Sequence, residues 1–137
     1  MTFALVMILA FADLAAVKTE PDLNKRSEMA LATADEKIDA ARQAYQANDT
    51  HAEAADIKEV GESVALCYAS LQETHKAPRK SKYYKQAELK ISALMRRLAS
   101  LREDVDFDFR PQVEAVLKNV SDIHDQLISD IMSRKKD

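Results

Sequence analysis

The scarcity of glycine constrains this chain more than any other feature of its sequence. Only one of the 137 residues is glycine and three are proline, whereas sandwiches, barrels and other strand-rich folds need such residues at their many tight turns. The sequence is instead rich in alanine, leucine, glutamate and lysine, which favour helices. It therefore predicts an all-α protein, and its length is that of a single domain with a core of its own.

Four segments repeat apolar residues at intervals of three and four, which is the period of a helix. The predicted helices cover residues 22–47, 50–74, 81–103 and 108–133, each with one apolar face and one charged face. Pro78 forbids a helix through the connection between the second and the third. Helices of this length with short connections predict an up-down-up-down four-helix bundle, with residues 48–50 and 104–108 at one end and 75–82 at the other.

The first twelve residues differ from the rest of the chain. They carry no charge, and Phe3 to Ala12 is an unbroken apolar run of ten residues. A membrane span needs about 20 residues, so no transmembrane span is predicted. The run has the length of the apolar part of a secretory signal, and Ala10 and Ala12 are small residues at the positions before a cleavage site. No cation precedes the run, so we interpret residues 1–12 as a truncated signal remnant and residues 13–137 as the single helical domain.

The interpretation of residues 1–12 sets the expected compartment. A signal remnant predicts a periplasmic or secreted bacterial protein. If residues 1–12 form a folded first helix instead, the protein is expected in the cytoplasm. The apolar residues of that segment would cover every side of a helix, which argues against an amphipathic one. The single cysteine, Cys67, cannot form an internal disulfide and does not distinguish the compartments.

The net charge of −3 is distributed unevenly. Residues 13–74 carry a net charge of −7, residues 75–103 carry +7 and residues 104–137 carry −3. The bases are densest between residues 75 and 85, where tyrosines accompany them. The candidate residues for binding an anion or a partner are Lys76, Arg79, Lys80, Lys82, Tyr83, Tyr84 and Lys85.

Two interpretations of this basic segment stay open. Cations beside aromatic rings can contact phosphates, stack on bases or lie on an anionic membrane surface. Alternatively, the segment is a solvated loop whose lysines and arginine reach acidic neighbours. Because the whole chain is acidic, nucleic acid is the less favoured partner.

A second charged motif, DVDFDF, places Asp104, Asp106 and Asp108 at alternate positions, as at the start of a calcium-binding loop. The motif then departs from that pattern. Phe109 stands where glycine is required, and Ala115 stands where the bidentate glutamate is required. We therefore interpret these acids as helix-capping residues in a turn.

Two positions inside the predicted helices were considered as parts of a ligand site. Met29 and His124 lie at comparable levels of the first and last helices, as do the haem ligands of b-type cytochrome bundles, but Met29 falls on the outer face of its helix and His124 only borders its apolar stripe. Gly61 interrupts the second helix and indicates either a close helix crossing, or room for an aromatic ring such as Tyr45, or a small ligand cavity. No cofactor is predicted from these residues.

No local group of residues points to catalysis. Cys67 falls on an apolar stripe, and the sequence contains neither a compact Ser/His/Asp group nor a glycine-rich loop for phosphate. We therefore expect no enzymatic activity. The leading hypothesis is a small exported helical bundle with a binding or structural role in the bacterial envelope, acting on an unidentified protein or anionic partner through residues 75–85. The alternatives are a haem- or metal-carrying bundle and an anion- or nucleic-acid-binding module.

Overall fold

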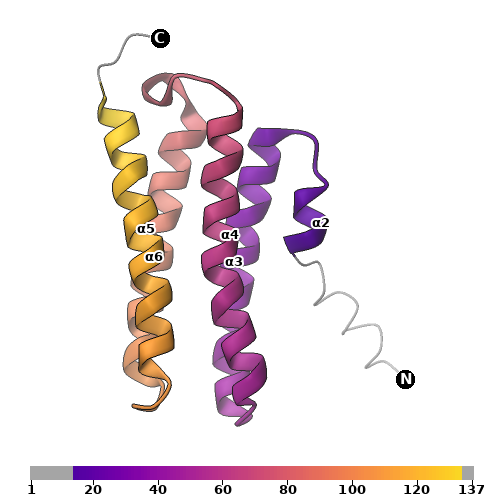
Figure 1. Cartoon of the computed structure of the whole chain (residues 1–137), viewed down its shortest axis with the longest axis vertical. Helices are drawn as coiled ribbons and strands as arrows, with labels where there is room; N and C mark the ends of the chain where they lie inside the picture. The colour runs from indigo at the N-terminus through magenta and orange to yellow at the C-terminus, as the bar shows by residue number, and fades with distance from the viewer. Residues whose placement is uncertain (1–13, 134–137) are drawn as a thin grey trace.

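The computed structural model describes residues 14–133, which contain five α-helices, one 3₁₀ turn and no strand (Figure 1). The all-α prediction is therefore confirmed. The elements are α2 (Leu14–Lys18), α3 (Leu23–Gln46), α4 (Thr50–Glu73), the 3₁₀ turn η1 (Pro78–Lys80), α5 (Lys82–Asp104) and α6 (Arg110–Met132). The predicted ends of the four long helices agree with the observed ends to within two residues.

The four long helices pack around a common core, and consecutive helices run in opposite directions (Figure 1). Helix α3 packs against α4 and α5, and α6 packs against the same two helices, whereas α3 and α6 are not neighbours. The order of the helices around the core is therefore α3, α4, α6, α5. The connection between α4 and α5 crosses the end of the structure diagonally. As predicted, the other two inter-helix connections lie together at the opposite end (Figure 1).

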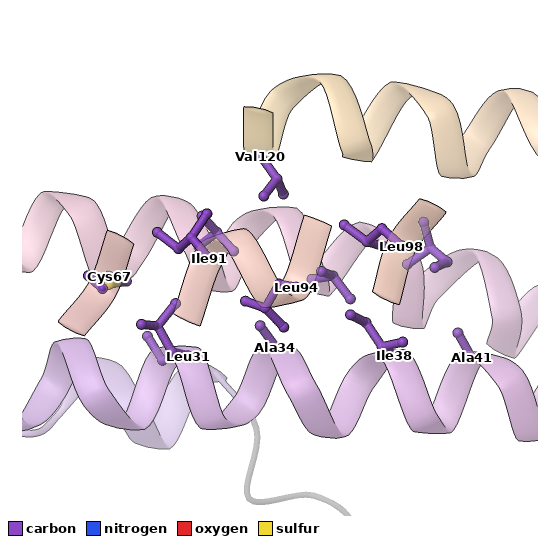
Figure 2. Close-up of a cluster of buried hydrophobic side chains, with 14 of the residues drawn as sticks. Leu31, Ala34, Ile38, Ala41, Cys67, Ile91, Leu94, Leu98 and Val120 are labelled. Carbon is purple, nitrogen blue, oxygen red and sulfur yellow. The ribbon is translucent and has the colours of Figure 1, made fainter. Parts of the chain in front are cut away.

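The core is built from one apolar stripe on each long helix (Figure 2). Helix α3 contributes mostly alanines, α4 and α5 contribute larger aliphatic side chains, and α6 buries three residues fully. These buried residues include Ala30, Leu31, Ala34, Ile38 and Ala41 of α3, Ile57, Val60, Val64, Cys67 and Leu71 of α4, Ile91, Leu94, Leu98 and Leu101 of α5, and Val113, Val120 and Leu127 of α6. Each fully buried leucine or isoleucine contributes about 1.5–3 kcal/mol to folding, so these stripes dominate the stability of the fold.

The short helix α2 was not predicted from the sequence. Its Leu14 and Val17, three residues apart on one face, are buried against the core. The turn that follows is closed by Arg26 of α3, whose Nε donates to the carbonyl oxygen of Glu20 at 2.9 Å. Residues 1–12, the predicted signal remnant, lie outside the described residues.

Side-chain caps explain why the helices begin where they do. The carboxylate of Asp22 accepts hydrogen bonds from Asn24 N and Lys25 N at the start of α3, and the carboxylate of Asp49 accepts one from Ala52 N at the start of α4. Caps of this kind typically contribute about 1 kcal/mol each. Asp106, one of the acids interpreted above as helix-capping residues, does not cap α6. Its carboxylate instead accepts a hydrogen bond from Phe109 N within the turn that leads into α6.

Gly61 marks the place where α4 and α6 cross closely. A Cβ atom added at Gly61 would lie 3.6 Å from Cγ1 of Val116. That distance is an ordinary van der Waals contact, so the neighbour of Gly61 at the crossing is a valine of α6 and not an aromatic ring, and Gly61 also lines a groove between the two helices.

Candidate functional site

The candidate site is the basic end of the molecule, which we define by the five cations of residues 76–85. These residues lie in the connection between α4 and α5 and in the first turn of α5. The connection crosses the end of the helices, and its 3₁₀ turn η1 packs against α5 and α6 (Figure 1). The side chains of Lys76, Arg79, Lys80, Lys82 and Lys85 are all exposed. Residues 74–87 contain no aspartate or glutamate.

None of these five cations forms an ion pair with any residue between Leu14 and Ser133. On the sides of the helices, by contrast, Arg42 pairs with Asp104 at 2.6 Å and Arg97 pairs with Asp35 at 2.5 Å. Other exposed cations there, such as Lys58 and Lys90, also form no ion pair with a described residue. The basic end is distinguished by the number of its unpaired cations and by the lack of acidic residues in 74–87.

The two tyrosines of the segment have different surroundings. Tyr83 is half-buried beside the cations, and Nζ of Lys82 lies 5.2 Å from the centre of its ring. Tyr84 is only 3% exposed and belongs to the core, so it is not available for contact with a partner. Burial raises the pKa of Tyr84, as expected for a phenol removed from water. The helical period already places Tyr84 on the same stripe as Ile91, so the sequence carried the signal that removes it from the basic surface.

A hollow of about 430 Å³ lies among the cations. Lys76, Lys80, Lys82 and Tyr83 line it, together with Asn24 from the first turn of α3. Asn24 was not predicted as part of the basic end, because the spacing of residues does not show which helix end lies beside the loop. The hollow also adjoins the N-terminus of α5, whose helix dipole adds a small positive potential to that of the lysines.

The opposite end of the bundle is acidic. Residues 47–56 and 103–109 carry seven carboxylates and no lysine or arginine. Helix α4 joins the two ends, and its 24 residues span about 35 Å at the rise of an α-helix. The molecule therefore has opposite charges at the two ends of its long axis.

The acids of the DVDFDF turn act on the protein itself. Asp104 pairs with Arg42, and Oδ1 of Asp106 accepts from Phe109 N at 3.2 Å. Over residues 14–133, no three or more His, Cys, Asp or Glu side chains are grouped so as to hold a metal ion. These contacts of Asp104 and Asp106 stabilise the turn, whereas the predicted capping of α6 by one of the acids is not observed.

Glu53 is an unusual member of the acidic end because its side chain is buried. It is 1% exposed, and its Oε2 has no hydrogen-bond partner. Burial raises the pKa of Glu53, and the nearby charge of Asp106 raises it further. The sequence alone did not indicate that Glu53 is buried.

A second polar cluster joins α5 to α6 through His124. Its Nε2 lies 2.9 Å from Oε2 of Glu88 and 2.9 Å from Oγ of Ser92. The hydrogen bond from His124 lowers the pKa of Glu88. In a hydrolytic triad the serine and the acid contact opposite nitrogens of the ring, whereas here both contact the same nitrogen. The cluster therefore has the geometry of a clamp between two helices.

The residues considered as a haem pair are not brought together. Met29 lies on α3 and His124 lies on α6, and these two helices are not neighbours. The Nε2 atom of His124, which would have to face a metal, already contacts Glu88 and Ser92. The core that α3 and α6 share with α4 and α5 is formed by apolar side chains of all four long helices.

Cys67 lies on the core face of α4 and is fully buried. Burial raises the pKa of its thiol to about 12, so almost no reactive thiolate is present at neutral pH. Its position beside Ile91 and Leu31 is that of a small apolar side chain (Figure 2).

Another hollow lies along α4 and α6, at the crossing marked by Gly61. It measures about 740 Å³, and small or apolar side chains such as Ala54, Ala65 and Ala115 form much of its wall. Lys58, Glu62 and other polar residues also line it. The shape is that of a shallow groove between two helices.

Comparison of the chain with protein-family models, curated proteins and solved structures gave no match. Among the described helices, none has the length and apolar character needed to cross a membrane. The charges and contacts of the described residues are therefore the basis for a proposed function.

The buried carboxyl group of Glu53 predicts a pH dependence of stability. Its folded-state pKa is raised, so its neutral form stabilises the fold below pH 4.5, and this contribution is lost as pH rises through the folded-state value. Near pH 4.5, the variant Glu53→Gln should therefore have the same unfolding free energy as the wild type. At pH 7, the unfolding free energy of the variant should be higher than that of the wild type by about 1–3 kcal/mol. Urea unfolding at a series of pH values measures this difference.

Glu62→Gln is the matched control for this prediction, because Glu62 lies on the same helix and is exposed. The control should follow the wild-type pH profile within error. An unfolding free energy of Glu53→Gln that stays at a constant offset from the wild type at every pH would contradict a buried, titrating carboxyl group.

Proposed function

We propose that this protein is a binding module in which α3 to α6 act as one four-helix bundle that presents its basic end to an anionic partner. The observation that carries the proposal is the set of five exposed cations without ion-pair partners. On the sides of the molecule, Arg42 of α3 and Arg97 of α5 are paired with carboxylates of neighbouring helices. Positive charge at the basic end is thus available for intermolecular contact.

The separation of charge along the molecule supports this role. An anionic partner attracts the basic end and repels the acidic one, so the molecule approaches in a fixed orientation. At physiological ionic strength the Debye length is about 8 Å. The acidic end, about 35 Å away, therefore does not cancel the attraction at the contact.

We propose in addition that the protein is exported to the periplasm or secreted, where it has a binding or structural role in a bacterial envelope. The support is the apolar run that ends in Ala10-Phe11-Ala12. Cleavage after Ala12 would leave α2 complete, with Leu14 and Val17 on the core.

Ion-exchange behaviour tests the proposed binding role. The net charge of −3 and the pI of about 5.6 would ordinarily prevent retention on a heparin column at pH 7 and low salt. The wild type should nevertheless be retained through its basic end and elute as salt screens the contact. The triple variant Lys76→Glu, Lys80→Glu, Lys82→Glu should pass through the column.

The control is a second triple variant, Lys58→Glu, Lys90→Glu, Arg96→Glu. It has the same change in net charge, and its three positions are also exposed and without ion pairs, but they lie on the sides of helices. It should still be retained. Equal loss of retention in both triple variants would show that net charge, and not the basic end, controls binding, and would contradict the proposal.

The export proposal has a direct test. N-terminal sequencing of the protein recovered from the periplasm or medium of its native host should give a chain that starts at Asp13. A chain that keeps Met1 or Thr2 would contradict cleavage after Ala12.

A further inference from the structure

The residues around the five cations indicate which class of anionic partner the basic end binds. We infer that the basic end docks on the surface of a lipid bilayer that contains anionic lipids, with the long axis of the helices pointing away from the membrane. This inference rests on the proposed binding role of the basic end. It is carried by three observations: an exposed apolar side chain, the number of cations, and the shape of the charged surface.

The first observation is Met132, which is 73% exposed at the C-terminal end of α6. The 3₁₀ turn η1, which carries Arg79 and Lys80, packs against this same helix. Exposure of a large apolar side chain to water is unfavourable. At a bilayer surface it enters the boundary between headgroups and acyl chains while the cations stay among the headgroups. The half-buried Tyr83 is an amphipathic side chain that suits the same depth.

The second observation is the number of cations at the basic end. Five lysines and arginines lie within residues 76–85, and residues 74–87 contain no aspartate or glutamate. Clusters of about four to eight lysines and arginines are typical of binding to anionic lipids.

The third observation is that the cations cover an end and not a side of the molecule. A nucleic acid strand that ran along the helices would meet the carboxylates of α3 and α4, such as Asp35 and Glu62. Sequence-tolerant strand binding also uses several open rings, whereas Tyr84 is buried and Lys82 lies over Tyr83. A planar surface meets the basic end alone and keeps the acidic end outside the range of the field. The geometry therefore favours a bilayer over nucleic acid.

Vesicle sedimentation with the full chain tests this inference. The probes are vesicles of phosphatidylcholine alone and vesicles in which part of the lipid is phosphatidylglycerol. The protein should sediment with the anionic vesicles only, and binding should fall as salt is raised. Each cation near the surface contributes about a fivefold factor in the partition coefficient. The Lys76→Glu, Lys80→Glu, Lys82→Glu variant should therefore bind at least about 100-fold more weakly.

Two single substitutions distinguish insertion of Met132 from attraction of charge alone. Met132→Ser should weaken binding to anionic vesicles by about fivefold, because the serine side chain gains nothing from the acyl boundary. Phe107→Ser is the matched control, since Phe107 is 81% exposed but lies at the acidic end. It should bind as the wild type does. Circular dichroism of each variant checks that the helices are retained.

The outcomes separate the bilayer inference from the proposed binding role. Retention on heparin without binding to anionic vesicles would overturn the bilayer and leave the binding role in place. Tighter binding to single-stranded DNA than to anionic vesicles would identify nucleic acid as the partner class and would also overturn the bilayer. Equal binding to charged and uncharged vesicles would show that the basic end is not the contact. Failure to bind heparin, DNA and vesicles alike would overturn both proposals.

Discussion

Burial of one apolar stripe from each of four long helices is the interaction on which the rest of this structure depends. The stripes leave the helices little choice of orientation, because each helix has a charged face that must stay in water. The same packing also buries residues that a local pattern alone would assign to the surface. Tyr84 stands in a run of cations, yet it occupies the first buried position of α5 and points into the core.

The order of the helices around the core then determines which charges are neutralised. Because α5 lies beside α3, Arg97 reaches both Asp35 and Asp39, and Arg42 reaches Asp104. Arg97 of α5 is in this way neutralised by carboxylates of α3. Lys76, Arg79 and Lys80 of the connection before α5, and Lys82 and Lys85 of its first turn, form no ion pair with a described residue. The functional surface is thus a consequence of topology as much as of sequence.

Much of the fold was predictable because its signals are local. Helix ends follow from Asp22, Asp49, Ser81 and Pro78, each of which acts on its own neighbours. The features that were missed depend on contacts between distant segments. The diagonal connection, the docking of α2, the position of Asn24 beside the basic loop and the burial of Glu53 all require knowledge of which elements meet. Five cations of the candidate site were identified from sequence, whereas their lack of partners needed the structure.

The central claim is that the molecule is electrically polar along its axis, with an unneutralised basic end. The most direct test is the relaxation of backbone amides by an anionic and by a cationic nitroxide, measured by NMR at physiological salt. The anionic probe should dominate at residues 76–85, and the cationic probe should dominate at residues 47–56 and 103–109. Equal effects of the two probes at the two ends would contradict the account, because they would mean that the basic end is neutralised in solution.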